Sequence, residues 1–338
     1  MIELSLKDVL ESLVMPLKIR GLPVPPIKFE EVQDLVEEFK HKLEQKLNVK
    51  PSLLYKLVVC NVVPYRAVPP AIRNLLLRTR KASLDNYIEK LELERIRKEF
   101  MKRIGAQKLQ PMYLITHDID TEKGLRRALK LKKVEDKYGV RSIWFILTGE
   151  YKLDKKIVKE LAEDHEIGSH DVKHDGKLIL LEKEEVVKRL KESKERLEQI
   201  IEKEVKWFRA PLLQHNMKII QAIKEAGYKY SSTSPAWEPA HPVTMKPYGV
   251  ELLDPVKVND VIEIPVTLPQ DHQMLHVIGL SSKKSVEEWM NMINELNETA
   301  VLLIHPDYEL NANHYKNIVK ALVEREQCSI AVNCLELL

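Results

Sequence analysis

From residue 111 to the C-terminus, short runs rich in apolar, β-branched or aromatic residues alternate with longer amphipathic stretches. Such runs stand at 112–116, 142–147, 206–209, 228–232, 261–265 and 300–304, and another leads into His170. Short runs of this kind, bounded by glycine, proline or charged residues, are typical of strands buried in a sheet. The pattern therefore predicts a series of strands, with one more after residue 325.

The amphipathic stretches between these runs predict helices. They cover residues 122–137, 182–202, 217–226, 285–297 and 313–325, and one more ends near residue 164. In the stretch 182–202 one face is apolar enough to pack on a sheet, and it carries Val186, Leu190, Ser193 and Leu197. Repeated strand–helix units predict an α/β protein with a parallel sheet, and their number predicts a (β/α) barrel.

Residues 1–105 show helical spacing without strands. Residues recur at helical spacing in two places, at Phe29, Val32, Val36, Phe39 and Leu43, and at Leu84, Ile88, Leu91 and Arg95 with its neighbour Ile96. A basic run alternates with leucines and predicts a solvated helix face rather than a nucleic-acid contact; it contains Arg73, Arg78, Arg80 and Lys81. We expect a helical extension over 1–105, which covers part of the main domain over 106–338 or forms a homo-oligomer contact.

The bulk composition excludes several classes of protein. The 338 residues carry 31% charged residues and a net charge of +3, which is too small to indicate a nucleic-acid or membrane partner. Charged residues interrupt the N-terminal 21 residues, and no run is long enough to span a bilayer, so we expect a cytoplasmic protein. The three cysteines are not spaced like a metal knuckle and are expected to be reduced; they are Cys60, Cys328 and Cys334.

Two histidines organise the candidate chemistry. His170 and His174 lie four residues apart on a predicted loop, where both rings can point the same way. Histidine is the commonest protein ligand of zinc, and a catalytic zinc site uses about three protein ligands with one position left open. Asp118 and Asp120 follow the first strand, so one can be the third ligand while the other takes a proton from water. Spacing alone does not decide between them, and two solvated turn aspartates are the alternative.

Two further polar residues follow strands. Arg209 can pair with a carboxylate at fixed geometry, and His305 can protonate a leaving group. In a (β/α) barrel the carboxyl ends of the strands converge on one face, so all these residues become neighbours. For His305 alone, a histidine that merely forms a hydrogen bond is the alternative.

In order along the chain, four motifs together resemble the NodB-type polysaccharide deacetylases, which form carbohydrate esterase family 4. They are 116–120 (THDID), 170–174 (HDVKH), 209–211 (RAP) and 302–305 (LLIH), and the resemblance covers about residues 111–332. It implies a distorted (β/α) barrel of about seven strands that removes acetyl groups from sugars with a bound divalent metal ion. Zinc is the expected ion, with cobalt or nickel as alternatives.

The resemblance also implies a role for each matching residue. Asp118 is then the base that Arg209 positions, and His305 is the general acid. The metal ligands are then Asp120, His170 and His174. Ile119 separates the two aspartates, as in the spaced-aspartate (D-x-D) branch that includes atypical peptidoglycan deacetylases and allantoinase-like amidohydrolases.

Other positions depart from the usual pattern or extend the site. Asp171 stands where serine or threonine is usual, so the internal hydrogen bonding of the loop is expected to differ. Asp307 is placed to orient the His305 ring. The proline-rich stretch 233–260 predicts a long loop without secondary structure, and its length favours a lid or substrate wall. Candidates for substrate binding are Pro211, Pro235, Trp237, His241, Tyr248 and His272.

The expected partner is a small-molecule or oligosaccharide substrate. The first hypothesis is a metal-dependent hydrolase that removes an acetyl group from an N-acetylated sugar or small glycan. An amidohydrolase acting on a non-sugar C–N bond is the second, and a catalytically silent barrel that binds a ligand or partner is the third. A base, an acid and a full ligand set speak against the silent barrel, because a binding protein has no need of all of them.

Overall fold

A computed structural model describes residues 3–60, 91–238, 241–307 and 312–325 of the chain. Several predictions lie outside these residues. They concern the basic run at 73–81, the first part of the second helical pattern (Leu84 and Ile88), the terminal strand, and two cysteines, Cys328 and Cys334.

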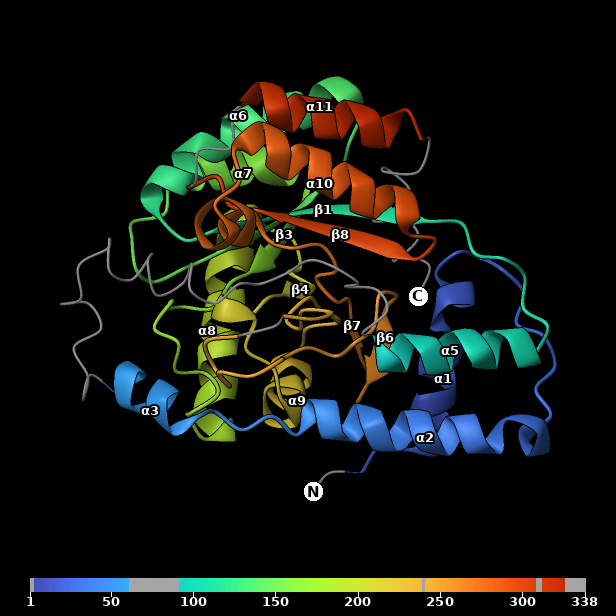
Figure 1. Ribbon diagram of the computed structural model, residues 1–338. Coiled ribbons are helices and arrows are strands. Elements are labelled where there is room, and N and C mark those ends of the chain that lie inside the picture. The colour runs from blue at the N-terminus through green and yellow to red at the C-terminus, as the bar shows by residue number, and fades with distance from the viewer. Residues whose placement is uncertain (1–2, 61–90, 239–240, 308–311, 326–338) are drawn as a thin grey trace.

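The described residues form one curled eight-stranded sheet at the centre of the molecule, which confirms the prediction of a barrel-like α/β fold (Figure 1). The strand order is β6-β7-β5-β4-β3-β2-β1-β8, and every neighbouring pair is parallel except β6 and β7. The strands are β1 (Met112–Ile119), β2 (Ile143–Ile146), β3 (Glu166–Ser169), β4 (Trp207–Phe208), β5 (Tyr230–Ser231), β6 (Val256–Val258), β7 (Val261–Glu263) and β8 (Thr299–Ile304).

Strand β6 lies inside the stretch that the sequence analysis treats as a loop. It forms a hairpin with β7, in which Val258 pairs with Val261. The two residues between them, Asn259 and Asp260, have φ values of 51° and 62°. Two left-handed residues in a two-residue connection are characteristic of a type I′ turn, which asparagine and aspartate tolerate well. The expectation of an unstructured connection from 233 to 260 is therefore wrong at its C-terminal end.

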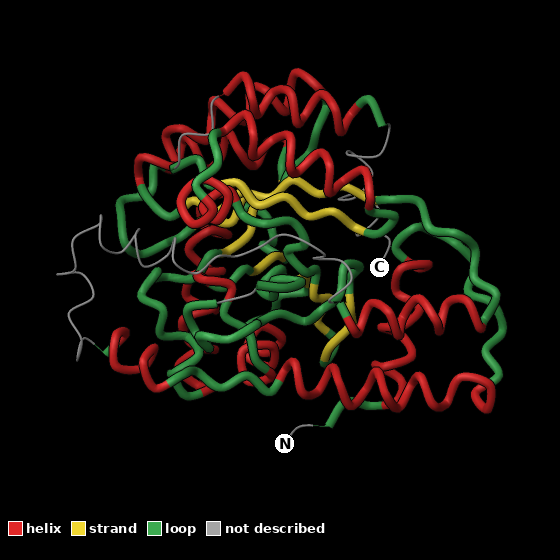
Figure 2. Tube along the Cα trace, viewed as in Figure 1, coloured by secondary structure: helices red, strands yellow, loops and turns green. Residues whose placement is uncertain are grey.

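In the described part of the main domain, six α-helices lie on the outside of the curled sheet (Figure 1). They are α6 (Glu122–Tyr138), α7 (Lys155–Asp164), α8 (Lys183–Ile201), α9 (Met217–Glu225), α10 (Ser282–Glu295) and α11 (Ala312–Val323). The limits of α6 follow from its sequence, because the Thr121 hydroxyl accepts from the Gly124 amide and Gly139 ends the helix at φ 67°. Figure 2 shows the same arrangement, with helices around the strands.

The described part of the N-terminal region is helical, with α1 (Leu6–Lys18), α2 (Phe29–Leu47), α3 (Leu53–Val59) and α5 (Glu92–Arg103). Helix α1 lies against β6, where the Ser12 hydroxyl donates to the Lys257 carbonyl at 2.8 Å. Met15 of α1, with Ile19 just after it, is buried in the same hydrophobic cluster as Met112, Trp207 and Ile262 of the sheet. The N-terminal region thus contributes side chains to the core of the sheet.

Buried charges also join the N-terminal region to the sheet. Asp254 accepts hydrogen bonds from Arg20 at 2.9 Å and from the Thr299 hydroxyl at 2.6 Å. The buried Arg97 guanidinium donates to the Asp254 carbonyl at 2.9 Å.

None of the described helices has both the length and the apolar character that crossing a membrane would require.

Candidate active site and metal centre

The predicted site residues come together at the carboxyl ends of the parallel strands. Strand β1 ends with Asp118 and Ile119. The first residue after β3 is His170, the first after β4 is Arg209, and the first after β8 is His305. Strand register aligns these ends, because Asp118 lies beside Phe145 of β2 and Ser169 beside Phe208 of β4. The sheet therefore presents residues far apart in sequence on one edge.

The three predicted metal ligands form a compact group. One ligand atom each from Asp120, His170 and His174 lies within 4.8 Å of the others. His170 Nε2 is 3.3 Å from Asp120 Oδ1, and His174 Nε2 is 3.9 Å from Asp120 Oδ2. The side chains of Asp120 and His174 are 21% and 27% exposed, whereas His170 is buried. A substrate would therefore approach from the side of Asp120 and His174.

The protonation of these groups fits a cation. His170 Nδ1 lies 2.9 Å from the Arg209 carbonyl and must donate to it, so the Nε2 lone pair of the neutral ring faces the carboxylates. Burial alone would lower the pKa of His170, but the negative charges of Asp118 and Asp120 raise it, and the same charges would favour a metal ion in place of the proton at Nε2. Asp120 Oδ1 is buried and receives no hydrogen bond of good geometry in the described part of the chain. A carboxylate oxygen and two imidazole nitrogens are suitable donors for zinc or a similar ion.

Arg209 fixes the predicted base. Its Nη1 donates to Asp118 Oδ1 and to the Thr116 hydroxyl, both at 2.9 Å. Its other nitrogens donate to the carbonyl and the hydroxyl of Ser232, each at 2.7 Å. The guanidinium also lies over the Phe145 ring, 4.2 Å from its centroid. Arginine can make all these contacts at once because its planar fork carries five N–H donors.

Asp271 is the partner of His305, and the sequence analysis missed it. His305 Nδ1 lies 2.6 Å from Asp271 Oδ1, and the His305 amide donates to Asp271 Oδ2 at 2.7 Å. Burial alone would lower the pKa of His305, but Asp271, with Asp120 and Asp118, raises it to about 10. Asp271 stands directly before His272, outside the four motifs, and no local pattern distinguishes it from an exposed aspartate.

Asp307 contacts the backbone beside the predicted metal ligand Asp120. The prediction that it orients the His305 ring is wrong, because Asp271 occupies that position. Asp307 instead accepts from the Asp120 amide at 3.3 Å and from the Thr121 hydroxyl at the start of α6. It therefore holds the backbone of a candidate metal ligand.

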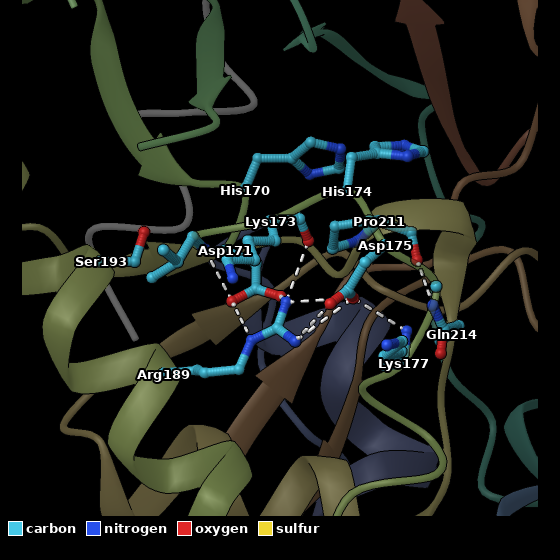
Figure 3. A network of polar contacts seen from close by, with 12 residues as sticks. His170, Asp171, Lys173, His174, Asp175, Lys177, Arg189, Ser193, Pro211 and Gln214 are labelled. Atoms are coloured by element: carbon cyan, nitrogen blue, oxygen red, sulfur yellow. Dashed lines mark hydrogen bonds and ion pairs between the residues drawn. The ribbon is translucent and has the colours of Figure 1, made fainter. Parts of the chain in front are cut away.

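The loop that carries the two histidines is held from outside by α8 (Figure 3). Arg189 of this helix forms ion pairs with Asp171 and Asp175. The Asp171 backbone has a φ of 70°, the left-handed region that favours glycine, directly after His170. Asp171 thus takes part in a charged network with Arg189 and Asp175.

The N-terminal region also reaches this loop. The Tyr55 hydroxyl of α3 donates to the Gly176 carbonyl at 2.6 Å, and Tyr55 is buried there. On the other side, Glu150 accepts from the His174 amide at 2.8 Å. Neither contact could be read from sequence, since each joins segments with no shared pattern.

Three of the six candidates for substrate binding, Pro211, Trp237 and His272, lie in different surroundings. Pro211 begins a short 3₁₀ turn (Pro211–Leu213) and is buried. Trp237 is partly buried against the main hydrophobic core. His272 lies beside the site: burial lowers its pKa to about 4, and the charges of His305 and Asp120 also act on it. A role for these three in substrate binding stays a prediction.

Two families of known proteins match parts of the chain. Residues 107–231 match the family of polysaccharide deacetylases, and residues 174–326 match glycosyl hydrolase family 57. The first match contains three of the four motifs, at 116–120, 170–174 and 209–211. It confirms the resemblance to polysaccharide deacetylases that the motifs predict.

Solved structures of this family resemble the chain. A Mycobacterium smegmatis protein described as a polysaccharide deacetylase is 16% identical, with a TM-score of 0.55 over 68% of this chain and 91% of that one, and so shares its fold. A family 4 carbohydrate esterase from Streptomyces lividans is 15% identical, with a TM-score of 0.45 and coverage of 64% and 91%. The peptidoglycan deacetylase PdaC from Bacillus subtilis is 14% identical, with a TM-score of 0.46 over 65% of this chain and 87% of that one. No curated protein sequence matches the chain.

Proposed function

We propose that this chain is a metal-dependent hydrolase that removes an acetyl group from an N-acetylated sugar or a related small glycan. The observation that carries the proposal is the convergence of three ligand atoms within 4.8 Å beside a carboxylate that Arg209 holds. The match to the polysaccharide deacetylase family supports the substrate class.

The residues of the site have complementary tasks in this reaction. Asp120, His170 and His174 would hold the ion. Once bound, the ion would supply Lewis-acid polarisation of the acyl carbonyl and raise the acidity of water. Asp118 would accept the proton of the water that adds to the carbonyl carbon. When the C–N bond breaks, His305 would deliver a proton from Nε2 to the departing nitrogen, because Asp271 keeps its ring charged.

An amidohydrolase of a non-sugar C–N bond remains the second candidate, because Ile119 separates the two aspartates as in the spaced-aspartate branch. The same catalytic groups would serve either substrate. The match to glycosyl hydrolase family 57 begins at residue 174 and so omits Asp118, Asp120 and His170. It therefore gives no support to a third reaction at this site.

Metal content, measured by elemental analysis, tests the proposal. The wild-type chain should carry about one zinc-like ion, and the double variant His170→Ala/His174→Ala should carry none. His41→Ala is the control, because His41 is an exposed histidine of α2. A wild-type protein that stays metal-free after incubation with zinc, cobalt or nickel would contradict the proposal.

Substrate class is tested next, on the metal-loaded protein. Release of acetate from N-acetylated sugars would favour the first candidate, and release of amine or ammonia from ureido compounds the second. The variant Asp118→Asn should abolish either activity while the ion stays bound. A metal-loaded protein without turnover on either class would favour the silent barrel.

A further inference from the structure

One arginine contacts the histidine loop at three places. Arg189 Nε lies 3.2 Å from Asp171 Oδ1, and its Nη2 forms a second contact with the same carboxylate. Nη1 lies 3.1 Å from Asp175 Oδ2, and Nη2 donates to the Lys173 carbonyl at 3.0 Å. The contacted positions 171, 173 and 175 are the neighbours of the two candidate metal ligands, so one guanidinium spans the whole loop (Figure 3).

The contacts hold the loop at its most constrained point. Asp171 is fully buried, and its Oδ1 also accepts from the Val172 amide at 2.6 Å. Its backbone is left-handed, a conformation that aspartate adopts more readily than most residues but that still costs energy relative to glycine. The ion pair with Arg189 offsets the cost of burying the Asp171 carboxylate and fixes the position of this side chain. The backbone at Asp171 is thereby held in its left-handed conformation.

Helix α8 provides a rigid base for the arginine. Ser193, one turn further along the helix, accepts from the hydroxyls of Ser169 and Thr148 at 2.6 and 3.0 Å. Ser169 immediately precedes His170. The face of α8 that carries Arg189 and Ser193 is thus tied to both ends of the turn that sets the direction of His170.

We propose that Arg189 is a positioning residue of the metal centre, which fixes the separation and direction of His170 and His174 through Asp171, Lys173 and Asp175. This inference rests on the proposed function, because it assigns the two histidines to a bound ion. Groups outside the ligand set typically change metal affinity 10- to 100-fold when they are lost. The geometry here favours such an effect, since one side chain restrains the loop around both ligands.

Two variants and one control test the role of Arg189. Arg189→Lys keeps the charge but cannot reach three loop positions. The double variant Asp171→Asn/Arg189→Met removes the buried charge together with its partner, so that no uncompensated charge prevents folding. Lys194→Met is the matched control, because Lys194 also lies on α8 and binds the Val205 carbonyl at 2.6 Å, away from the histidine loop.

The readouts are the zinc dissociation constant, measured by competition with a chelating dye, and the visible absorption spectrum of the cobalt-loaded protein. Both Arg189 variants should bind zinc about 10- to 100-fold more weakly than wild type and show an altered cobalt spectrum. Lys194→Met should match wild type in both, even if it lowers the melting temperature.

Two results would overturn the positioning role. The first is a folded Arg189→Lys with the affinity and spectrum of wild type. The second is a double variant that regains wild-type affinity, because Arg189 would then only neutralise Asp171. A wild-type protein that binds no zinc would instead remove the proposed function, and this inference with it.

Discussion

Asp271 contacts His305 at two points, through the ring Nδ1 at 2.6 Å and through the backbone amide at 2.7 Å. The two contacts fix both the orientation of the ring and the nitrogen that faces the carboxylate. His305 Nε2 then points toward the metal ligands and lies 4.0 Å from Asp120 Oδ2. A charged imidazole in this position is suited to donate a proton to a leaving group.

The first prediction concerns this pair. Asp271→Asn removes the charge that raises the pKa of His305, so this pKa should fall. A general acid must be protonated, so the alkaline limb of the pH–rate profile should move to lower pH. The value of kcat should fall about 10²-fold, the lower end of what general acid catalysis contributes.

Asp307→Asn is the control for this prediction. Asp307 accepts from the Asp120 amide and the Thr121 hydroxyl, whereas Asp271 is the carboxylate that accepts from the His305 ring. Its variant should leave the alkaline limb in place. The assignment fails if Asp307→Asn moves that limb and Asp271→Asn does not.

The site residues at the strand ends could be predicted from the sequence because a strand end is a local feature. A short apolar run followed by a polar residue marks where a buried strand reaches the edge of a sheet, and this rule found Asp118, His170, Arg209 and His305. The parallel sheet then brings these residues together without further information. The helices could be predicted for the same reason, from the helical spacing of their apolar residues and from the residues at their ends, such as Gly139 at the end of α6.

The supporting residues could not be predicted in this way. Asp271 lies 34 residues before its partner His305, at the start of a helical turn that leads into a short π-helix (Gln273–Ile278). Arg189 stands in a helix rich in lysine and glutamate, where a charged residue is normally solvated. Their importance comes from which segments the fold brings into contact, and no local pattern encodes that.

The second prediction concerns Arg209→Lys. Lysine can replace one of the contacts with Asp118, Thr116 and Ser232 but cannot bridge all three, because its ammonium is a single point. The base should lose its fixed position, and kcat should fall about 10²-fold. Steady-state kinetics with a parallel zinc titration would separate the two effects: zinc affinity should stay within a few-fold of wild type. A variant that retains kcat would show that Asp118 needs no such restraint.

The third prediction concerns pH-dependent stability. Burial raises the pKa of Glu238 to about 7, although Gln270 and Gln273 donate to its carboxylate. Between the ordinary value of 4.5 and about 7, the unfolded chain releases this proton while the folded chain keeps it. The contribution of Glu238 therefore becomes less favourable as pH rises through this window and is constant above it. At about 1.4 kcal/mol per pKa unit, the change is about 3 kcal/mol.

Glu238→Gln tests this by removing the titration. The free energy of unfolding, from urea melts at several pH values, should decline between pH 4.5 and 7 more steeply in wild type than in the variant. The two curves should run parallel above that window. Parallel curves throughout would mean that Glu238 ionises in the folded protein as easily as in the unfolded chain.

The last prediction concerns the N-terminal region, whose Met15 is buried in the cluster that contains Trp207 and Ile262 of the sheet. Met15→Ala should lower the free energy of unfolding by about 2–5 kcal/mol, the usual cost of emptying such a position. Leu6→Ala on the same helix is the control, since Leu6 is 46% exposed and should change stability by less than about 0.5 kcal/mol. All four tryptophans follow residue 106, so their fluorescence during urea unfolding reports on the barrel alone. If Met15→Ala left that transition unchanged, α1 would be an appendage that the barrel does not need; a shifted midpoint would make it part of the barrel core.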